Sequence, residues 1–474
     1  MFTFKQFTGI HIPKVKETEV ILTRIKSFLE RRIAQYNTSD FVLYKFYKET
    51  DKEVIVPRFF PLERFTDAVI ENRVPTGNKI NITHSITLRS RTQRDAITFM
   101  QVNKNGILQL LPGVGKTIIS IHMIAERKLK SFILVHRDSL VDQWTDKILQ
   151  FTNINPDNIV RLRSSSFVKD LQKDIIICTS QTFVSLLKRQ EVLFLDQLYK
   201  SNIGIFIADE IHTSVGAPTF SNCSLNIPAK YVYGLSATPY RNDGTSDIIE
   251  YHLGKIFSDE DTEGTMTARV TVLLFDYGID IPRRYKYLYW GGDFQRSRYL
   301  NMMIKSKIFM NVSMGILSKT KKDRDLLFIS ERIKLIDKLY DLLDFQSKSK
   351  FIGVAKMDQL ESKVVFATPG KIRDGIDVPK KDTLIMTSPI SNIEQIAGRV
   401  LRVDKNKKEP VIIDMVDFGC KRICGTFFKR NSFYKKKEWT INYVLLLKNQ
   451  MKTIDEEVAI KILKGEEDEI CNNC

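Results

Sequence analysis

The sequence predicts an α/β fold in which two parallel-sheet domains follow a small α+β domain. Short apolar runs alternate with helical stretches from Ile86 to about Lys255, and the alternation resumes from about Arg298. Between the two series lies the polar, acidic stretch 258–264, which is typical of a linker. Strands that alternate with helices form parallel sheets with helices on their faces, so each series predicts one such domain.

The first 86 residues follow a different pattern. Apolar residues recur at helical spacing from Val20 to Ile33, which predicts one amphipathic helix. Two strand-like runs come next, from Phe41 to Tyr47 and from Val54 to Val56, and the polar turn 49–52 joins them. This mixture predicts a small α+β domain over residues 1–86.

The two later series fix the expected positions of the main elements. In the first domain, residues 87–257, we expect strands at 106–111, 132–135, 174–178, 203–208 and 231–235. After a connector over 258–300, the second domain is expected over 301–419, with strands at 326–329, 364–367, 384–386 and 411–413. Helices are expected at 298–317 and 333–343. Residues 420–474 are expected to form a C-terminal tail that is first basic and later acidic.

Composition limits the class of partner. The 474 residues include 73 Lys and Arg against 56 Asp and Glu, a net charge of +17. Such an excess favours a polyanion, although solubilising lysines in a basic proteome would give the same balance. No apolar run approaches the roughly 20 residues of a membrane span, and the N-terminus lacks a secretory apolar core. We therefore expect an intracellular chain without a membrane partner, whose six cysteines are reduced thiols.

A phosphate-binding loop is predicted at residues 110–117, which read LLPGVGKT between a strand and a helix. Glycines let backbone N–H groups surround phosphates, the lysine reaches the terminal phosphates, and the hydroxyl holds Mg²⁺. The full pattern is not met, because Leu110 stands where the first glycine would be. The residues expected to contact the nucleotide are Leu111, Pro112, Gly113, Val114, Gly115, Lys116 and Thr117.

A pair of carboxylates follows a buried strand further along the chain. Asp209 at the strand end could hold Mg²⁺, and Glu210 could orient and deprotonate an attacking water. A solvated acidic turn is the simpler alternative, but the apolar strand 205–208 directly before the pair argues against it. Coupling to later parts of the chain is expected from His212, Ser236 and Thr238.

The segment from Gln395 to Arg402, QIAGRVLR, is expected to form a helix. Arg399 and Arg402 stand three residues apart, so on a helix they share a face and can point at one phosphate. Arginine suits this role because its planar fork donates two parallel hydrogen bonds. The alternative is a surface helix whose arginines only solubilise it.

The order of these motifs resembles a superfamily 2 helicase of the DExH type over roughly residues 86–417. The resemblance implies two RecA-like domains that close around ATP and Mg²⁺, with Arg399 and Arg402 as arginine fingers. It implies that Gln93 reads adenine, that Gly375 and Asp377 contact the nucleotide, and that Gln395 couples the site to movement. Nucleic-acid contacts are implied for Arg137, Thr179, Gln181, Thr368 and Arg373.

Within the superfamily, the loop proline, LSATP at 235–239 and QIAGRVLR look most like the group of the XPB translocase, phage UvsW and the poxviral transcript-release helicase. This resemblance implies a viral enzyme that acts on DNA, or on RNA or a hybrid, without sequence preference. An RNA polymerase or replication proteins are the implied partners, and the host cytoplasm or the virion is the implied location. Residues 1–86 and the basic run 429–437 could grip duplex flanks. The short stretch 344–363 departs from the family and puts a nucleic-acid contact there in doubt.

Other classes of protein fit part of the pattern. A catalytically vestigial assembly factor of a polymerase complex would retain the nucleotide fold, but the intact Lys116 and Glu210 argue against it. A small-molecule P-loop kinase would not explain a second α/β domain ending in paired arginines. The pairs Cys420/Cys424 and Cys471/Cys474 have spacings that zinc sites use, but they lie far apart, so we expect no zinc site.

Overall fold

The computed structural model divides into two compact units, residues 1–263 and 264–474, which are described separately. The structure describes residues 2–34, 41–111, 113–211, 218–240, 244–259, 266–276, 287–291, 293–353, 355–373, 378, 380–387, 389–391, 393–401, 407–447 and 450–466.

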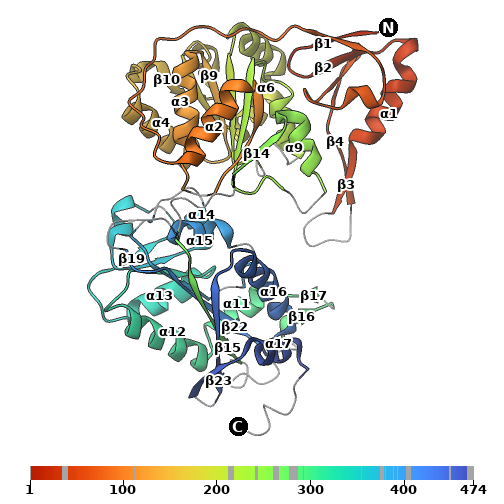
Figure 1. Ribbon diagram of the computed structural model, residues 1–474. Helices are drawn as coiled ribbons and strands as arrows, with labels where there is room; N and C mark the ends of the chain where they lie inside the picture. Colours follow the sequence, from red (N-terminus) through yellow and green to blue (C-terminus); the bar gives the residue numbers. More distant parts are fainter. Residues whose placement is uncertain are drawn as a thin grey trace. The chain divides into compact units, whose positions relative to one another are not determined.

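The first unit begins with a small α+β part (Figure 1). Its main sheet has the order β5-β6-β2-β1-β7, and β3 pairs with β4 in a separate hairpin. The elements are β1 (Thr3–Gln6), β2 (Ile10–Pro13), α1 (Glu19–Leu29), β3 (Glu30–Ala34), β4 (Phe41–Lys45), β5 (Lys48–Glu49), β6 (Glu53–Val56) and β7 (Val69–Asn72). Buried Arg58 fastens this part to the rest of the unit, since its guanidinium donates to the carbonyl oxygens of Ile227 and Ala229 at 2.9 and 2.8 Å.

The rest of the first unit is built on a seven-stranded parallel sheet in the order β10-β11-β9-β12-β13-β8-β14. Its strands are β8 (Asn105–Gln109), β9 (Ser131–Val135), β10 (Ile159–Arg161), β11 (Ile175–Thr179), β12 (Ile205–Asp209), β13 (Tyr231–Ser236) and β14 (Ile256–Ser258). Its helices are α2 (Arg91–Val102), α3 (Lys116–Arg127), α4 (Asp138–Phe151), α5 (Phe167–Asp170), α6 (Ser180–Lys200), α8 (Pro218–Ser224) and α9 (Ser246–Leu253).

Successive residues of these strands belong to two different cores. Ile133 and Ile207 pack in the core of α2, α3 and α4, whereas Phe132 and Phe206 pack in the core of α6 and α9. Because side chains alternate across a strand, the helices cover opposite faces of the sheet, as Figure 1 shows.

The second unit contains an eight-stranded sheet in the order β19-β20-β18-β21-β22-β15-β23-β24, which is parallel except for the β23–β24 pair. Its strands are β15 (Arg269–Phe275), β18 (Leu326–Ile329), β19 (Lys348–Phe351), β20 (Val364–Ala367), β21 (Thr383–Met386), β22 (Val411–Asp417), β23 (Thr440–Leu447) and β24 (Gln450–Ile454); β16 (Tyr289–Trp290) and β17 (Asp293–Phe294) form a separate pair. Its helices are α11 (Arg296–Met303), α12 (Lys307–Thr320), α13 (Ile333–Leu342), α14 (Pro369–Arg373), α15 (Glu394–Val400), α16 (Lys421–Lys436) and α17 (Glu456–Lys464). Helices α14–α17 pack in one core and α11–α13 in another, on the two faces of the sheet.

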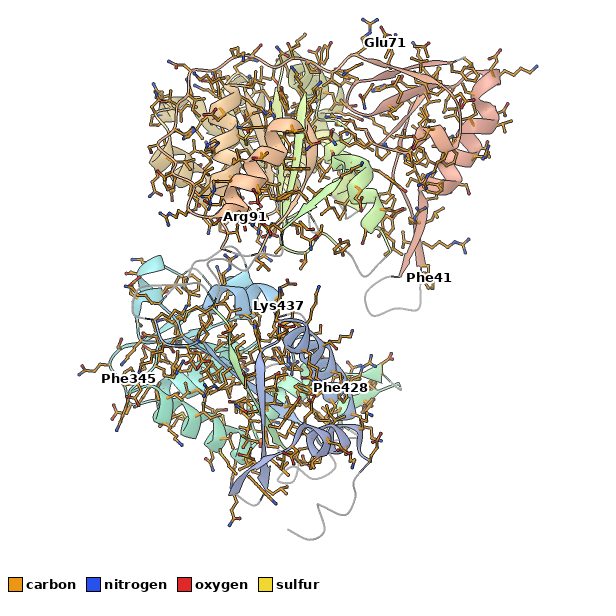
Figure 2. All side chains as sticks on the ribbon, in the orientation of Figure 1. Phe41, Glu71, Arg91, Phe345, Phe428 and Lys437 are labelled. Carbon is orange, nitrogen blue, oxygen red and sulfur yellow. The ribbon has the colours of Figure 1, made fainter. Side chains whose placement is uncertain are left out.

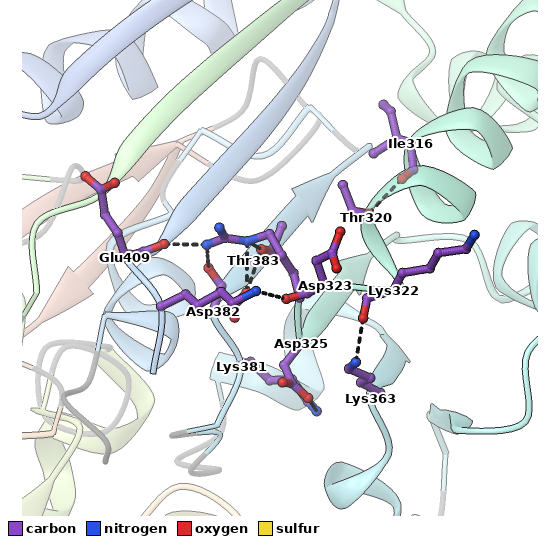
Figure 3. Close-up of polar contacts among 12 residues, drawn as sticks. Ile316, Thr320, Lys322, Asp323, Asp325, Lys363, Lys381, Asp382, Thr383 and Glu409 are labelled. Carbon is purple, nitrogen blue, oxygen red and sulfur yellow. Dashed lines mark hydrogen bonds and ion pairs between the residues drawn. The ribbon is translucent and has the colours of Figure 1, made fainter. Parts of the chain in front are cut away.

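Ion pairs and a side-chain hydrogen bond join the amino ends of three strands in this second sheet (Figure 3). Arg324, before β18, donates from Nε to Asp382 Oδ1 at 3.1 Å and from Nη2 to the carbonyl oxygen of Glu409. Lys381, which is 1% exposed, lies 3.9 Å from Asp325. These contacts lie at the amino ends of the strands. Because the strands are parallel, the loops that follow them project from the opposite end of the sheet.

The predicted fold class is confirmed: two parallel-dominated sheets with helices on both faces follow a small α+β part. Three local predictions were wrong. The helix expected as far as Ile33 ends at Leu29, and Ile33 lies in β3. The run from Phe41 pairs with β3, while the partner of β6 across the predicted turn is β5. The single helix expected over 298–317 is two helices, because Ser306 caps α12 by accepting from the Phe309 N–H at 3.2 Å.

Candidate functional site

The described residues of the first unit that are predicted to bind a nucleotide gather at one edge of its large sheet. Strands β8, β9, β11, β12 and β13 run parallel, so their carboxyl ends meet at the same edge. The loop after β8, Asp209 at the end of β12 and Ser236 at the end of β13 therefore lie together. Ligands of open α/β sheets bind at this edge.

The loop between β8 and α3 has the backbone of a phosphate cradle. Gly113 and Gly115 have φ angles of 98° and 94°, a region that disfavours residues with a Cβ. Gly115 is the N-cap of α3, whose first residues are Lys116 and Thr117. The unsatisfied N–H groups of a helix start, with the helix dipole behind them, attract phosphate oxygens. Pro112 lies outside the described residues.

Gln93 supports this loop from α2, whose first residue is Arg91 (Figure 2). Its amide Nε2 donates to the carbonyl oxygen of Val114 at 2.7 Å, and its Oε1 accepts from the Arg89 N–H at 2.7 Å. A Cβ on Gly115 would lie 2.9 Å from Nε2. Gln93 therefore lies against the loop predicted to bind phosphate, and glycine is needed for that close approach.

Lys116 points back into its own loop. Its ammonium donates to the carbonyl oxygen of Leu110 at 2.8 Å and to that of Leu111 at 3.4 Å. Its charge also acts on Asp209, whose pKa it lowers. The ammonium thus lies against the loop and within electrostatic range of the carboxylate, where a terminal phosphate with its metal ion would be held.

Asp209 is fixed by two hydrogen bonds. Its Oδ2 accepts from the indole Nε1–H of Trp144 at 2.9 Å, and its Oδ1 accepts from the Glu210 N–H at 3.0 Å. Trp144 is 1% exposed and lies on α4, so packing as well as hydrogen bonding sets its position. The sequence pattern did not single out Trp144, because nothing in spacing shows which carboxylate a tryptophan N–H will meet.

The electrostatics of Asp209 are those of a buried anion. Burial, and next the neighbouring charge of Glu210, raise its pKa to about 6. The Trp144 hydrogen bond and the charge of Lys116 act in the opposite direction. A divalent cation would stabilise such a carboxylate further, because bound ions are the largest local charges in a site.

Glu210 and Ser236 lie at the same edge of the sheet as Asp209. Glu210 has a φ of 50°, an uncommon backbone conformation for a residue other than glycine. Ser236 is fully buried; its carbonyl oxygen accepts from the Leu110 N–H at 3.1 Å, and its Oγ accepts from the Thr238 N–H at 3.0 Å. Ser236 therefore links the end of β13 to the start of the phosphate loop, and Thr238 bonds to Ser236. His212 lies outside the part of the chain that the structure describes.

Three residues predicted to contact nucleic acid follow β9 and β11. Arg137 is exposed at the start of α4, and Gln181 is exposed in the first turn of α6. Thr179 is only 5% exposed, and its Oγ1 caps α6 by accepting from the Thr182 N–H at 3.2 Å. Arg137 and Gln181 are thus exposed to solvent, whereas the Thr179 hydroxyl is hydrogen-bonded within the fold.

In the second unit, Thr368 follows β20 and Arg399 lies on α15, 7% exposed. Arg430, on α16, holds the segment before α15: its Nη1 donates to the carbonyl oxygen of Ile390 at 2.7 Å. Its Nε and Nη2 donate to both carboxylate oxygens of Asp414 at 2.8 and 3.0 Å. The sequence did not predict this buried network.

Several predicted site residues cannot be placed. Gly375, Asp377 and Arg402 lie outside the described ranges, and for Arg373 and Gln395 only the backbone position is described, on α14 and α15. Among the cysteines considered for zinc, Cys420 and Cys424 are buried, and burial raises the pKa of the Cys424 thiol to about 12. Cys471 and Cys474 lie beyond the last described residue.

The residues present fit a magnesium nucleotide. The fit rests on the donor set: a glycine-lined helix start, an ammonium beside it, and a buried carboxylate with a raised pKa within reach of that charge. Lys116 and the helix start suit phosphate oxygens, while Thr117 and Asp209 offer the hard oxygen ligands that Mg²⁺ prefers.

Comparison with protein families places the candidate site within a matched segment. Residues 76–241 match the family model described as the type III restriction enzyme, res subunit. The matched segment contains the phosphate loop, the Asp209–Glu210 pair and Ser236. The match therefore includes the residues that form the candidate site of the first unit.

Several proteins of similar sequence are viral. A protein of Acanthamoeba polyphaga mimivirus described as an ATP-dependent RNA helicase is 26% identical over 418 residues, which cover 84% of this chain and 77% of that protein. The transcript termination protein of Yaba-like disease virus is 26% identical over 433 residues, 84% of this chain and 82% of that protein. The crystal structure of T4 UvsW covers 94% of this chain and 100% of that chain, at 16% identity and a TM-score of 0.37.

Within the described ranges, no helix combines the length and the apolar character that crossing a membrane requires.

Proposed function

We propose that this chain is a superfamily 2 helicase that couples ATP hydrolysis to movement along nucleic acid or to its unwinding. The observation that carries the proposal is the meeting of Lys116 and Asp209 at one sheet edge, beside a loop with two glycines in left-handed conformation. This arrangement supports a magnesium-nucleotide site, and the net charge of +17 supports a nucleic-acid partner.

Each residue has a distinct task in this proposal. ATP with Mg²⁺ supplies the phosphoanhydride bond whose cleavage releases the free energy. Lys116 and the start of α3 hold the phosphates, and Asp209 with Thr117 positions the ion. Glu210 takes the proton of the attacking water. Arg399 and Arg402 stabilise charge that develops in the transition state, Gly375 and Asp377 contact the nucleotide, and His212 and Gln395 couple hydrolysis to movement.

The proposed substrate is DNA, with RNA or a hybrid as the alternative, bound through its phosphate backbone without sequence preference. The protein of Yaba-like disease virus is named as a transcript termination protein, which supports a role in viral transcription beside an RNA polymerase. Replication or recombination partners are the alternative. The proposed location is the host cytoplasm, in a viral factory, or the virion.

The decisive experiment measures ATP turnover with and without single-stranded DNA, duplex DNA and RNA. We expect at least one nucleic acid to raise turnover, Lys116→Ala to abolish it, and Glu210→Gln to retain ATP binding while hydrolysis is largely lost. Lys200→Ala is the matched control, because Lys200 is exposed at the far end of α6 and pairs with Asp196. Turnover that no nucleic acid alters would instead favour the vestigial assembly factor or the small-molecule kinase.

A further inference from the structure

Three side chains with metal-binding groups meet beside α3, away from the phosphate loop. His122 and Glu126 stand one turn apart on α3, and His84 comes from the segment that precedes α2. His84 Nε2 lies 3.1 Å from Glu126 Oε1, and the rings of His84 and His122 are 4.3 Å apart. One possible ligand atom from each of the three residues lies within 4.8 Å of the other two.

The donor set matches a particular class of ion. Imidazole nitrogens suit Zn²⁺ and its neighbours in the first transition row, whereas Mg²⁺ prefers oxygen ligands alone. Zinc–nitrogen bonds of about 2.0–2.1 Å require tetrahedral ligand atoms to approach to roughly 3.3 Å. Glu126 Oε1 and His84 Nε2 are already 3.1 Å apart, and the side chain of Glu126, 52% exposed, has room to rotate towards an ion. A water molecule would complete the coordination.

His122 is suited to be a ligand. Its Nδ1 is buried, and the described residues supply no hydrogen-bond partner for it. The ring therefore has hydrogen-bonding capacity that the fold leaves unused.

If an ion binds at His84, the proton of its ring must move from one nitrogen to the other. The Ile86 N–H donates to its Nδ1 at 3.2 Å, so the ring proton sits on Nε2 and is shared with Glu126. An ion bound at Nε2 takes the place of that proton, which moves to Nδ1. The long hydrogen bond from Ile86 then opens, and the number of protons on the ring does not change.

We propose that His84, His122 and Glu126 form a binding site for a divalent transition-metal ion of the zinc class, distinct from the magnesium-nucleotide site. The ion would join the segment before α2 to α3, the helix whose first residues are Lys116 and Thr117. In this way it would fix the far end of the helix that begins at the phosphate loop.

The site can be tested on the full chain without nucleotide. The metal-free protein, prepared with a chelator, is titrated calorimetrically with Zn²⁺ in excess Mg²⁺. We expect one Zn²⁺ site per chain. The affinity for Zn²⁺ should fall at least about tenfold in His122→Gln and in Glu126→Gln, because mutating even a residue that only supports a metal ligand lowers the affinity by that much. His11→Gln is the matched control, because His11 also lies 2.9 Å from a glutamate, Glu53, but has no second histidine in that pair.

A cobalt titration separates this site from the cysteines. Co²⁺ bound by imidazole and carboxylate gives weak visible bands, whereas thiolate ligands add an intense near-ultraviolet charge-transfer band. The proposal is overturned if the wild-type chain binds no Zn²⁺, if both variants bind it like the wild type, or if the thiolate band accompanies binding. Circular dichroism of the metal-free variants checks that they fold, and the half-exposed Glu126 makes its variant the safer one.

Discussion

At the scale of single residues, the hydrogen bond from Trp144 to Asp209 determines how the site presents its buried carboxylate. The indole N–H has no acceptor role, so it can only favour the ionised form of Asp209. This form is the one that holds a divalent cation. Trp144 is therefore a positioning residue for Asp209, and its removal should have a specific signature.

We expect Trp144→Phe to raise the pKa of Asp209 above its present value of about 6, because the ionised carboxylate loses a donor. The acidic limb of the pH profile of turnover should move to higher pH, and more Mg²⁺ should be needed for half-maximal rate. The measurement is turnover against pH at several Mg²⁺ concentrations. Trp439→Phe, a buried tryptophan of the second unit, is the control, and an identical profile in both variants would exclude this role.

The second prediction at this scale concerns the arginine predicted from the sequence at position 402. Arg402→Lys should retain binding of ATP and nucleic acid but lose most hydrolysis, because a finger acts chiefly in the transition state. The measurement is single-turnover hydrolysis at saturating ligands, with Arg399→Lys in parallel. A rate within about threefold of the wild type, against the roughly 10³-fold loss expected of a finger, would show that Arg402 is not one.

The sequence predicts site residues that follow strands, but it does not predict residues that act through the packing of helices. Lys116 and Asp209 follow strands of one parallel sheet, so their order along the chain already places them at a common edge. Trp144 and Arg430 act through contacts made by helix packing, which leave no periodic trace. The role of Gln93 against Val114 is of the same kind.

At the scale of elements, α9 is packed through a buried histidine. His252 is 2% exposed, its Nε2 is hydrogen-bonded to the Ser221 hydroxyl, and burial lowers its pKa to about 3. The native state thus holds a neutral imidazole, whereas the unfolded chain takes up a proton near pH 6.5. The junction of α8 and α9 is therefore sensitive to acid.

The sign of the pH dependence follows from these two pKa values. The stability that neutral His252 contributes is complete above about pH 6.5 and is lost as the pH falls towards 3, by up to a few kcal/mol. Urea unfolding of the first unit, followed at several pH values, should show this loss in the wild type and less of it in His252→Gln. His11→Gln should keep the full dependence; a His252→Gln curve parallel to the wild type would contradict the assignment.

The elements also show where sequence patterns reach their limit. The bounds of the buried strand β18 were predicted correctly, because a short run of Leu, Phe and Ile between polar residues forms few structures other than a buried strand. The helix predicted over 298–317 breaks at Ser306, where a capping hydroxyl overrides a continuous apolar pattern. Strand β23 was missed because it adds to the sheet through long-range pairing with β15.

At the scale of the whole molecule, the positive charge should govern binding. We expect affinity for duplex DNA to fall steeply with salt, with a slope of about −0.9 per phosphate contacted. Arg137→Ala, at the edge where the site lies, should reduce the magnitude of the slope by about one, and Lys200→Ala should leave it unchanged. Fluorescence anisotropy across a salt series measures both. Equal slopes for all three proteins would remove Arg137 from the contact surface.

The distribution of tryptophans gives the molecule a built-in optical probe. The sequence holds three, of which Trp144 alone lies in the first unit, while Trp290 and Trp439 lie in the second. With the latter two replaced by phenylalanine, all indole emission would come from the ring that touches Asp209. The wavelength and intensity of this emission would then change when the carboxylate is protonated and when an ion binds. Binding at the site could therefore be followed in real time without an attached dye.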